Sequence, residues 1–276
     1  MVTTEQAVAA AQAVAREQRL PADTPEVVRD ATNVLVRLAP APVVARVPIT
    51  LARLRGREWF ADEMSLATFL AAAGAPVAPP TDLVDPGPHE RDGLHVSLWR
   101  WIDHDERRVD PAAAGAALHT LHAALEGYGG ALPTCDRLDE VRRLLASFEQ
   151  TDEVAELRAF AERLAPLDGR PIHGDSHLRN VLWSAHGPLW SDLENACRGP
   201  VAFDLACLRF RGSPEDEAAI RAYGGHDEAS LEAALPYVTL FLAAWTFVVV
   251  QRTPSSAAHD EARRRVERAL AYAREM

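Results

Sequence analysis

Apolar and polar positions alternate in the front part of the chain and follow helical spacing in the back part. Alternation over five or more residues is typical of half-buried strands, and apolar residues three and four apart are typical of helices. The front part therefore predicts a small sheet with two helices. Its expected strands cover 33–38, 43–49, 83–84 and 94–102, and its expected helices cover 4–18 and 58–73.

After Asp110 the pattern becomes almost entirely helical. The exception is a pair of short strands joined by a polar turn, expected over 181–184 and 188–191. The expected helices cover 111–126, 136–148, 152–165, 201–210, 214–223, 228–251 and 257–274. A strand-rich front over residues 1–102 and a helical back over 103–276 predict an α+β chain with two lobes.

Composition narrows the function classes. The chain has 276 residues, 48% of them hydrophobic, and a net charge of −11. This supports a large buried core and excludes disorder, and the acidic balance argues against a nucleic-acid surface. The three cysteines, Cys135, Cys197 and Cys207, show no CxxC spacing, so neither a disulfide framework nor a zinc site is implied.

We expect a cytoplasmic protein, because the sequence shows neither a signal-peptide pattern nor a membrane span. The start of the chain lacks the basic and then apolar layout of a signal peptide. The most apolar run, 236–250, has 15 residues and includes Pro, Thr and Tyr. A membrane span needs about 20 residues. We therefore expect a buried helix there and no membrane partner.

Residues 171–192 hold the densest set of candidate catalytic side chains. Asp175 and Asn180 lie in the turn His-Gly-Asp-Ser-His-Leu-Arg-Asn, and Asp192 follows the expected strand pair. A kinase-type site needs a carboxylate for the attacking hydroxyl, an amide oxygen on Mg²⁺, and a second carboxylate between metal and phosphates. These three residues supply that set in order, and a hairpin would return Asp192 to Asn180.

Three ordered blocks resemble the aminoglycoside phosphotransferase/choline kinase-like family, relatives of the protein kinases. The blocks are His-Gly-Asp-Ser-His-Leu-Arg-Asn at 173–180, Ser-Asp-Leu-Glu at 191–194, and Gly-Pro-Val-Ala-Phe-Asp-Leu-Ala at 199–206. The resemblance implies a bilobal protein-kinase-like fold, with a small β-rich N-terminal lobe and a larger, mostly helical C-terminal lobe. ATP would bind between the lobes, GTP being the alternative, together with Mg²⁺.

The resemblance also implies roles for single residues. Asp175 would be the catalytic base, and Asn180 and Asp192 would hold Mg²⁺. Asp204, at a helix start, would brace the catalytic loop. The acceptor would be a hydroxyl of a small molecule: an aminoglycoside-like antibiotic, an amino alcohol or a sugar.

The nucleotide side departs from kinase chemistry in one respect. All 29 basic residues are arginine, so no strand lysine can contact the phosphates. Arg46 stands where the family places that residue. Glu63 on the following helix is its expected partner, with Glu58 as the alternative. An arginine would offer a planar, bidentate fork in place of a point charge.

Two further segments are candidates for nucleotide contacts. The expected phosphate loop, 29–33, contains no glycine, so Thr32 and Asn33 are expected to donate from their side chains. Trp99, Arg100 and Trp101 end a strand where the family binds adenine. Either a tryptophan stacks on the base or backbone groups contact it; the tryptophans can instead be core residues.

Other interpretations of the same residues remain. His173, Asp175 and His177 alternate like metal ligands, and a plain polar turn is also conceivable. The acidic groups at 215–217 and 227–228 attract an aminated ligand or simply begin helices. A catalytically silent nucleotide-binding protein is the alternative function, and the oligomeric state is open.

Overall fold

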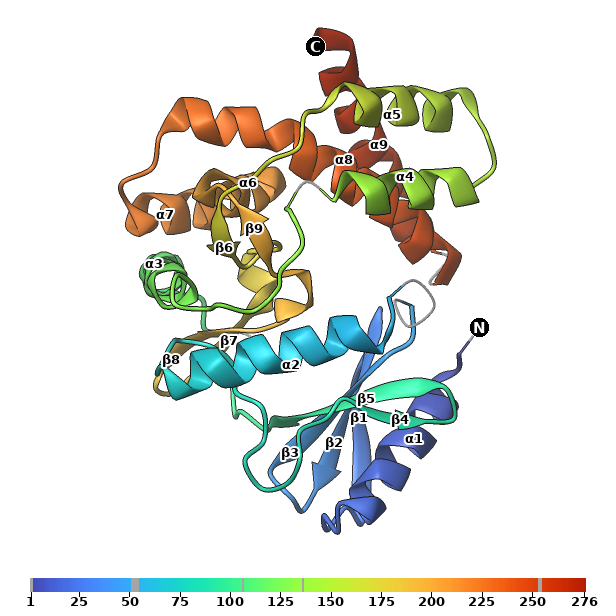
Figure 1. Ribbon diagram of the computed structural model, residues 1–276, viewed down its shortest axis with the longest axis vertical. Coiled ribbons are helices and arrows are strands. Elements are labelled where there is room, and N and C mark those ends of the chain that lie inside the picture. Colours follow the sequence, from blue (N-terminus) through green and yellow to red (C-terminus); the bar gives the residue numbers. More distant parts are fainter. Residues whose placement is uncertain (1, 51–54, 106, 136, 253–254) are drawn as a thin grey trace. The chain divides into compact units, whose positions relative to one another are not determined.

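Figure 1 shows the computed structural model, which describes residues 2–50, 55–105, 107–135, 137–252 and 255–276. The chain forms two compact units. Unit 1 contains residues 1–131 and 179–194, and unit 2 contains 132–178 and 195–276. The expected lobes, residues 1–102 and 103–276, divide the chain at another point than these two units do, and they stay a prediction. Each unit is built around its own elements.

Unit 1 contains a five-stranded antiparallel sheet in the order β1-β2-β3-β5-β4. Three of the four strands expected in the front part are present. The strands are β1 (Thr24–Asp30), β2 (Asn33–Ala39), β3 (Val43–Pro48), β4 (His89–Arg91) and β5 (Leu94–Arg100).

Two strands were not anticipated and one expected strand is wrong. β1 is an edge strand exposed at nearly every position, so it shows no alternation, and β4 has only three residues. Leu83 and Val84 form a bend instead of a strand. The reason is local: the N–H of Leu83 donates to the hydroxyl oxygen of Thr81 rather than to a neighbouring strand.

One face of the sheet packs against α1 (Thr4–Glu17), as Figure 1 shows. A capping box between Thr3 and Gln6 begins this helix. Its buried side chains are alanines and one valine, which are small enough to let the helix lie close to the strands. The joint core includes Ala7, Ala10, Ala11, Val14, Ala15, Val34, Val36, Leu38, Val43, Ala45, Val47, Leu94, Val96 and Leu98.

Unit 1 also contains two helices and a hairpin. α2 (Arg57–Ala72) contacts β5 and α3 (Pro111–Leu125), and α3 contacts the hairpin of β7 (Val181–Ser184) and β8 (Gly187–Trp190). The fully buried indole of Trp190 donates to the carbonyl of Ala114 at 3.3 Å. The predicted strand pair is therefore confirmed, and its end is fixed on α3.

Unit 2 is mostly helical. Its only strands among the described residues are β6 (Arg170–Ile172) and β9 (Cys197–Gly199), which pair antiparallel and were too short to predict. Residue 136, where the first of its helices was expected to begin, lies outside the described residues. The helices are α4 (Leu138–Ser147), α5 (Asp152–Arg163), α6 (Val201–Arg211), α7 (Pro214–Tyr223), α8 (Glu228–Arg252) and α9 (Ser256–Glu275). Two 3₁₀ turns complete the chain, η2 (Leu178–Asn180) and η3 (Leu193–Asn195).

α8 contains the most apolar segment of the chain. By length and composition, 228–250 is able to cross a membrane, with a mean hydropathy of 2.0 in its most apolar stretch. However, 61% of that stretch is buried, because α8 packs against α4, α6 and α9. This is the environment of a core helix, as the sequence indicated.

The cross-strand pair Val27–Val36 gives a matched test of this core. Val36 is fully buried beneath α1, whereas Val27 is 42% exposed. We expect Val36→Ala to lower the free energy of unfolding by about 1–3 kcal/mol, because two buried methyl groups are lost. Val27→Ala should stay within about 0.5 kcal/mol of the wild type. Urea melts of both variants measure the difference, and equal losses would contradict the packing described.

Candidate functional site

The face of the sheet opposite α1 carries polar and aromatic side chains. Along a strand, neighbouring side chains point to opposite faces. Val34, Ala45 and Leu98 pack toward α1, so Asn33, Arg46 and other residues in alternate positions point the other way. This second face therefore gathers the candidate nucleotide residues on β2, β3 and β5.

Arg46 is buried at the centre of a cluster of carboxylates. Its guanidinium donates to Glu63 of α2. Its Nη1 lies 3.1 Å from Asp192 Oδ1 and 3.7 Å from Glu194 Oε2. Its carbon Cζ lies 5.4 Å from the centre of the Trp99 ring. The expected Arg46–Glu63 pair is present, while the alternative partner, Glu58, is exposed.

The electrostatics of this cluster are unbalanced. Burial opposes the charge of Arg46, but Glu63, Glu194 and Asp192 raise its pKa overall. Burial raises the pKa of Glu63 to about 7, although Arg46 acts against this shift. Burial and the nearby Asp192 also raise the pKa of Glu194. Arg46 and the buried Arg55, which acts to lower the pKa of Glu194, face three buried or half-buried carboxylates, so the cluster keeps an excess of negative charge and favours an additional cation or a retained proton.

Glu194 is a site residue that the sequence analysis missed. It is buried, and its carboxylate accepts from the side-chain amide of Asn33 at 3.3 Å. Its carbonyl accepts from Trp59 Nε1 at 2.7 Å and from Arg55 Nη1 at 3.3 Å. The available signal was a second acidic residue two positions after Asp192, within the block 191–194.

The hairpin joins the two candidate metal ligands. Asn180 is buried, and its carbonyl accepts from both the N–H and the hydroxyl of Ser191, at 2.8 and 2.9 Å. Asp192 follows directly, so the predicted return of Asp192 to Asn180 is confirmed. Asp192 has a φ of +66°, a conformation that Asp tolerates better than most residues and that is often found at functional sites.

This arrangement fits a magnesium–nucleotide complex. Three buried atoms, Arg46 Nε, Glu63 Oε1 and Asn33 Oδ1, have no hydrogen-bond partner among the described residues. Mg²⁺ is usually held by one or two carboxylates together with substrate phosphates, and Asn180 and Asp192 offer the oxygen donors it prefers. No group of three His, Cys, Asp or Glu side chains in the described part of the chain is placed to hold a metal alone.

Several side-chain and backbone groups of the strand end 99–101 have partners within unit 1. The indole of Trp99 donates to Ser97 Oγ at 2.9 Å, and Trp101 packs under the guanidinium of Arg37 at 4.4 Å. The exposed Arg100 side chain pairs with Asp82. The N–H groups of Arg100 and Trp101 donate to carbonyls of residues 79 and 42. Adenine recognition by residues 99–101 stays a prediction. It would use side-chain faces or backbone groups other than those engaged in these hydrogen bonds.

The phosphate-loop candidates behave differently from each other. Asn33 joins the Arg46 cluster through Glu194. Thr32 contributes its carbonyl, which accepts from the N–H groups of Ile49 and Thr50 at 3.2 Å each. These bonds hold the glycine-free loop to the end of β3 without requiring a left-handed residue. The role of the Thr32 hydroxyl stays a prediction.

Asp175 lies in unit 2, in a set of contacts of its own. Its Oδ2 accepts from Asn195 Nδ2 at 3.3 Å, and its Oδ1 lies 3.8 Å from His177 Nε2. Its N–H donates to His173 Nδ1 at 3.3 Å. His173 Nδ1 therefore supports the turn itself, and the His-Asp-His set is not among groups placed to hold a metal ion in the described part of the chain.

Asp204 braces the turn that carries Asp175. It is fully buried at the start of α6, and its two carboxylate oxygens accept from the N–H groups of His173 and Gly174, each at 2.8 Å. Gly174 has a φ of +79°, and a Cβ there would lie 2.0 Å from the carbonyl oxygen of Asn195. Only glycine fits this close approach, and the bracing role expected for Asp204 is confirmed.

The acidic groups of unit 2 begin helices. Asp216 forms a capping box with Ser213 at the start of α7. Glu217 and Glu228 both pair with Arg209. These contacts agree with the interpretation that the acidic groups begin helices.

The raised pKa of Glu63 predicts a pH dependence of stability. Between its ordinary value of 4.5 and about 7, the folded protein holds a proton that the unfolded chain has released. Rising pH therefore lowers stability across this window. In urea melts of the nucleotide-free protein from pH 5 to 8, Glu63→Gln should lose less stability than the wild type. The exposed Glu58→Gln on the same helix should follow the wild type, and parallel curves for Glu63→Gln would contradict the assignment.

Comparison with known proteins agrees with this geometry. The model of the phosphotransferase enzyme family, abbreviated APH, matches residues 3–237. Amicoumacin kinase hAmiN, solved with AMP-PNP, Ca²⁺ and Ami, is 14% identical with a TM-score of 0.72, covering 95% of this chain and 93% of that chain. No curated protein matches this sequence.

Two further solved structures show the same fold. Choline kinase LicA from Streptococcus pneumoniae is 14% identical with a TM-score of 0.69, covering 95% of this chain and 98% of that one. APH(2")-IIia, solved with GDP and kanamycin, is 15% identical with a TM-score of 0.66 and the same coverage. The predicted α+β, kinase-like fold is confirmed. With a family match over most of its length, the chain belongs to the phosphotransferase enzyme family.

Proposed function

We propose that this protein is a kinase of small molecules, which transfers the γ-phosphate of ATP to a hydroxyl group and uses Mg²⁺. The observation that carries the proposal is the buried Arg46, paired with Glu63 of α2 and lying 3.1 Å from Asp192. Kinases use such a strand cation and helix glutamate to hold the phosphates beside a metal-binding aspartate. Arg46 supplies the cation in a chain without lysine.

The nucleotide would be held mainly by Arg46. A guanidinium presents several donors in a fixed plane, so it can contact a carboxylate and a phosphate at once. Its Nε has no partner among the described residues. Related structures were solved with AMP-PNP, with GDP and with ADP. ATP is therefore the proposed donor, and GTP is the alternative to test beside it.

Asn180 and Asp192 would hold the metal. Mg²⁺, when bound, neutralises charge that develops on the phosphates during transfer. The surplus of carboxylates around Arg46 suits the arrival of a cation, because it would relieve repulsion among Asp192, Glu194 and Glu63. Asn33 orients Glu194 within this set.

Asp175 would act on the acceptor. Its carboxylate would orient the attacking hydroxyl and take its proton as the oxygen attacks the γ-phosphorus in line with the leaving group. Asp204 holds the turn in place through two backbone hydrogen bonds. The proposed acceptors are aminoglycoside-like antibiotics, amino alcohols and sugars, and the proposed location is the cytoplasm.

The test is an acceptor panel with ATP and GTP, read by release of nucleoside diphosphate. The panel should contain aminoglycosides, choline and ethanolamine, and sugars. We expect at least one acceptor to stimulate diphosphate release, with a phosphorylated product visible by mass spectrometry. Nucleotide binding without transfer to any of them would favour the silent, regulatory protein instead.

Asp175→Asn should remove transfer while it leaves nucleotide affinity within about threefold, because this carboxylate acts on the acceptor. The expected loss in kcat is on the order of 10²–10⁴, the usual contribution of a general base. Rapid kinetics for turnover and titration calorimetry for nucleotide affinity separate the two effects. Turnover near that of the wild type would refute the assignment.

Arg46→Ala should raise the KM for nucleotide and lower kcat together. Loss of a charge-assisted contact costs roughly 1.5–3 kcal/mol, or about 10–150-fold in kcat/KM. Arg46→Lys should restore only part of this, because an ammonium group cannot make two parallel contacts.

Arg107→Ala is the matched control. It removes an exposed arginine of the same unit, whose side chain pairs with Asp105. We expect its kinetics to equal those of the wild type. If Arg46→Ala is as active as Arg107→Ala, Arg46 has no part in phosphate binding.

A further inference from the structure

Asn195 contacts the turn that carries Asp175, and Arg137 contacts Asn195. Both residues lie outside the three sequence blocks 173–180, 191–194 and 199–206. We infer that Arg137 is a positioning residue that acts through the side chain of Asn195 to hold the carboxylate of Asp175 for acceptor activation. The inference rests on the proposed function and deepens it. It assigns to this chain a specific means of orienting its catalytic base.

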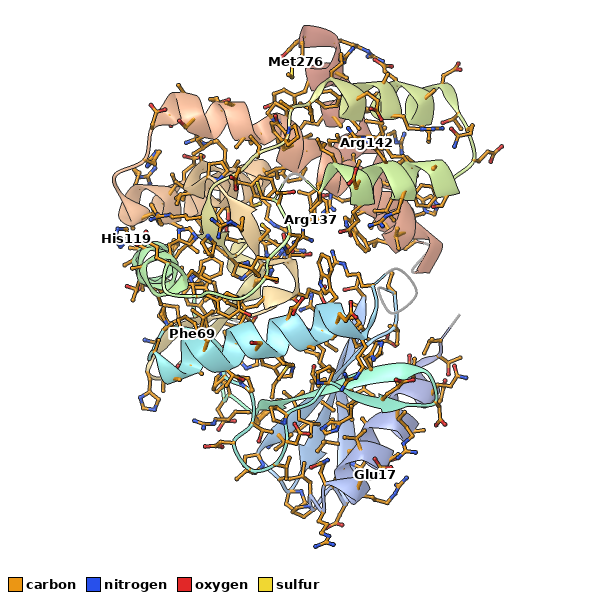
Figure 2. The ribbon with its side chains drawn as sticks, in the orientation of Figure 1. Glu17, Phe69, His119, Arg137, Arg142 and Met276 are labelled. Atoms are coloured by element: carbon orange, nitrogen blue, oxygen red, sulfur yellow. The ribbon has the colours of Figure 1, made fainter. Side chains whose placement is uncertain are left out.

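Arg137 is a buried cation in an unusual backbone position. It directly precedes α4, where Figure 2 labels it, and has a φ of +43° although it is not glycine. Its guanidinium lies over the ring of Phe241 at 5.3 Å, and its Nη1 is 4.0 Å from the carboxylate of Glu140. A long, rotamer-rich side chain held in this way has few alternative conformations.

The guanidinium grips Asn195 at two points. Nη1 donates to Asn195 Oδ1 at 2.5 Å, and Nη2 donates to the backbone carbonyl of the same residue. Asn195 is itself buried, and its Nδ2 donates to Asp175 Oδ2 at 3.3 Å. A chain of donors therefore runs from Arg137 through Asn195 to the proposed catalytic base.

The direction of this chain follows from the chemistry of the two ends. Guanidinium groups only donate, and an ionised carboxylate only accepts. The amide of Asn195 must therefore turn its oxygen to Arg137 and its nitrogen to Asp175, and a flipped amide would lose both bonds. With Oδ2 engaged by the amide, the orientation of the Asp175 carboxylate is fixed before an acceptor arrives, which is the condition for efficient attack.

Structural support and positioning can be separated, because Arg137 makes two different contacts with Asn195. The bond to the backbone carbonyl supports the chain beside Gly174, where the approach is too close for a Cβ. The bond to Oδ1 affects only the side chain. Asn195→Ala keeps the first contact and removes the second, so it tests positioning without loss of the backbone support.

The experiment measures kcat and KM for the acceptor identified by the panel, together with nucleotide affinity. We expect Asn195→Ala to lower kcat by about 10–100-fold, the effect of one lost bond to a charged group, with both KM values within about threefold. Asn195→Asp should be at least as slow, because it keeps an acceptor for Arg137 but places a second carboxylate against Asp175.

A double-mutant cycle then tests the part played by Arg137. Arg137→Lys should lower kcat in the wild-type background but have little further effect on kcat in the Asn195→Ala background, because the two residues act in series. Arg142→Lys is the matched control, and its kcat should be unchanged. Arg142 lies on α4 and pairs with Asp139 on the same helix.

Full turnover by Asn195→Ala, or equal losses from Arg137→Lys in both backgrounds, would overturn the inference while transfer by the wild type upholds the proposed function. Absence of transfer by the wild-type protein would overturn both. Thermal melts of all variants identify a folding defect, and kcat is expressed per mole of protein that binds nucleotide, so that a lower active fraction does not enter the cycle.

Discussion

The nucleotide side of this protein depends on one buried guanidinium. Arg46 joins β3 to α2 through Glu63 and reaches the hairpin end through Asp192 and Glu194. A buried charge is tolerated only when it is paired and hydrogen-bonded, so the elements that supply its partners must stay together. Trp59 and Arg55 reinforce this arrangement through their bonds to the carbonyl of Glu194.

The excess of negative charge in this cluster connects folding with function. Burial, together with repulsion among the carboxylates around Arg46, raises the pKa of Glu63 and Glu194, although Arg46 and, for Glu194, Arg55 act against the shift. The proposed Mg²⁺ beside Asp192 would relieve this repulsion. Local instability at a binding site, stabilised by the rest of the fold, is common in enzymes.

The turn that carries Asp175 is held by neutral and charged hydrogen bonds and not by a cluster of like charges. Asp204 satisfies two backbone N–H groups, Gly174 permits the close approach to Asn195, and Asn195 contacts Asp175. Each contact joins segments about 20 to 30 residues apart in the sequence. The turn is therefore rigid because several distant segments converge on it, and Arg137 adds one from 58 residues away.

Local pattern determined much of this protein by itself. Alternation and helical spacing located most elements, and the ordered residues Asp175, Asn180, Asp192 and Asp204 identified the family, because these signals lie within a few residues of one another. The edge strand β1 and the short pairs of β6 and β9 escaped prediction, since exposure or brevity leaves no periodicity. Only the tertiary structure decided that Glu194 joins the Arg46 cluster and that Arg137 reaches Asn195, because pairing between distant buried polar groups is selected by geometry and desolvation, and neither is written in local sequence.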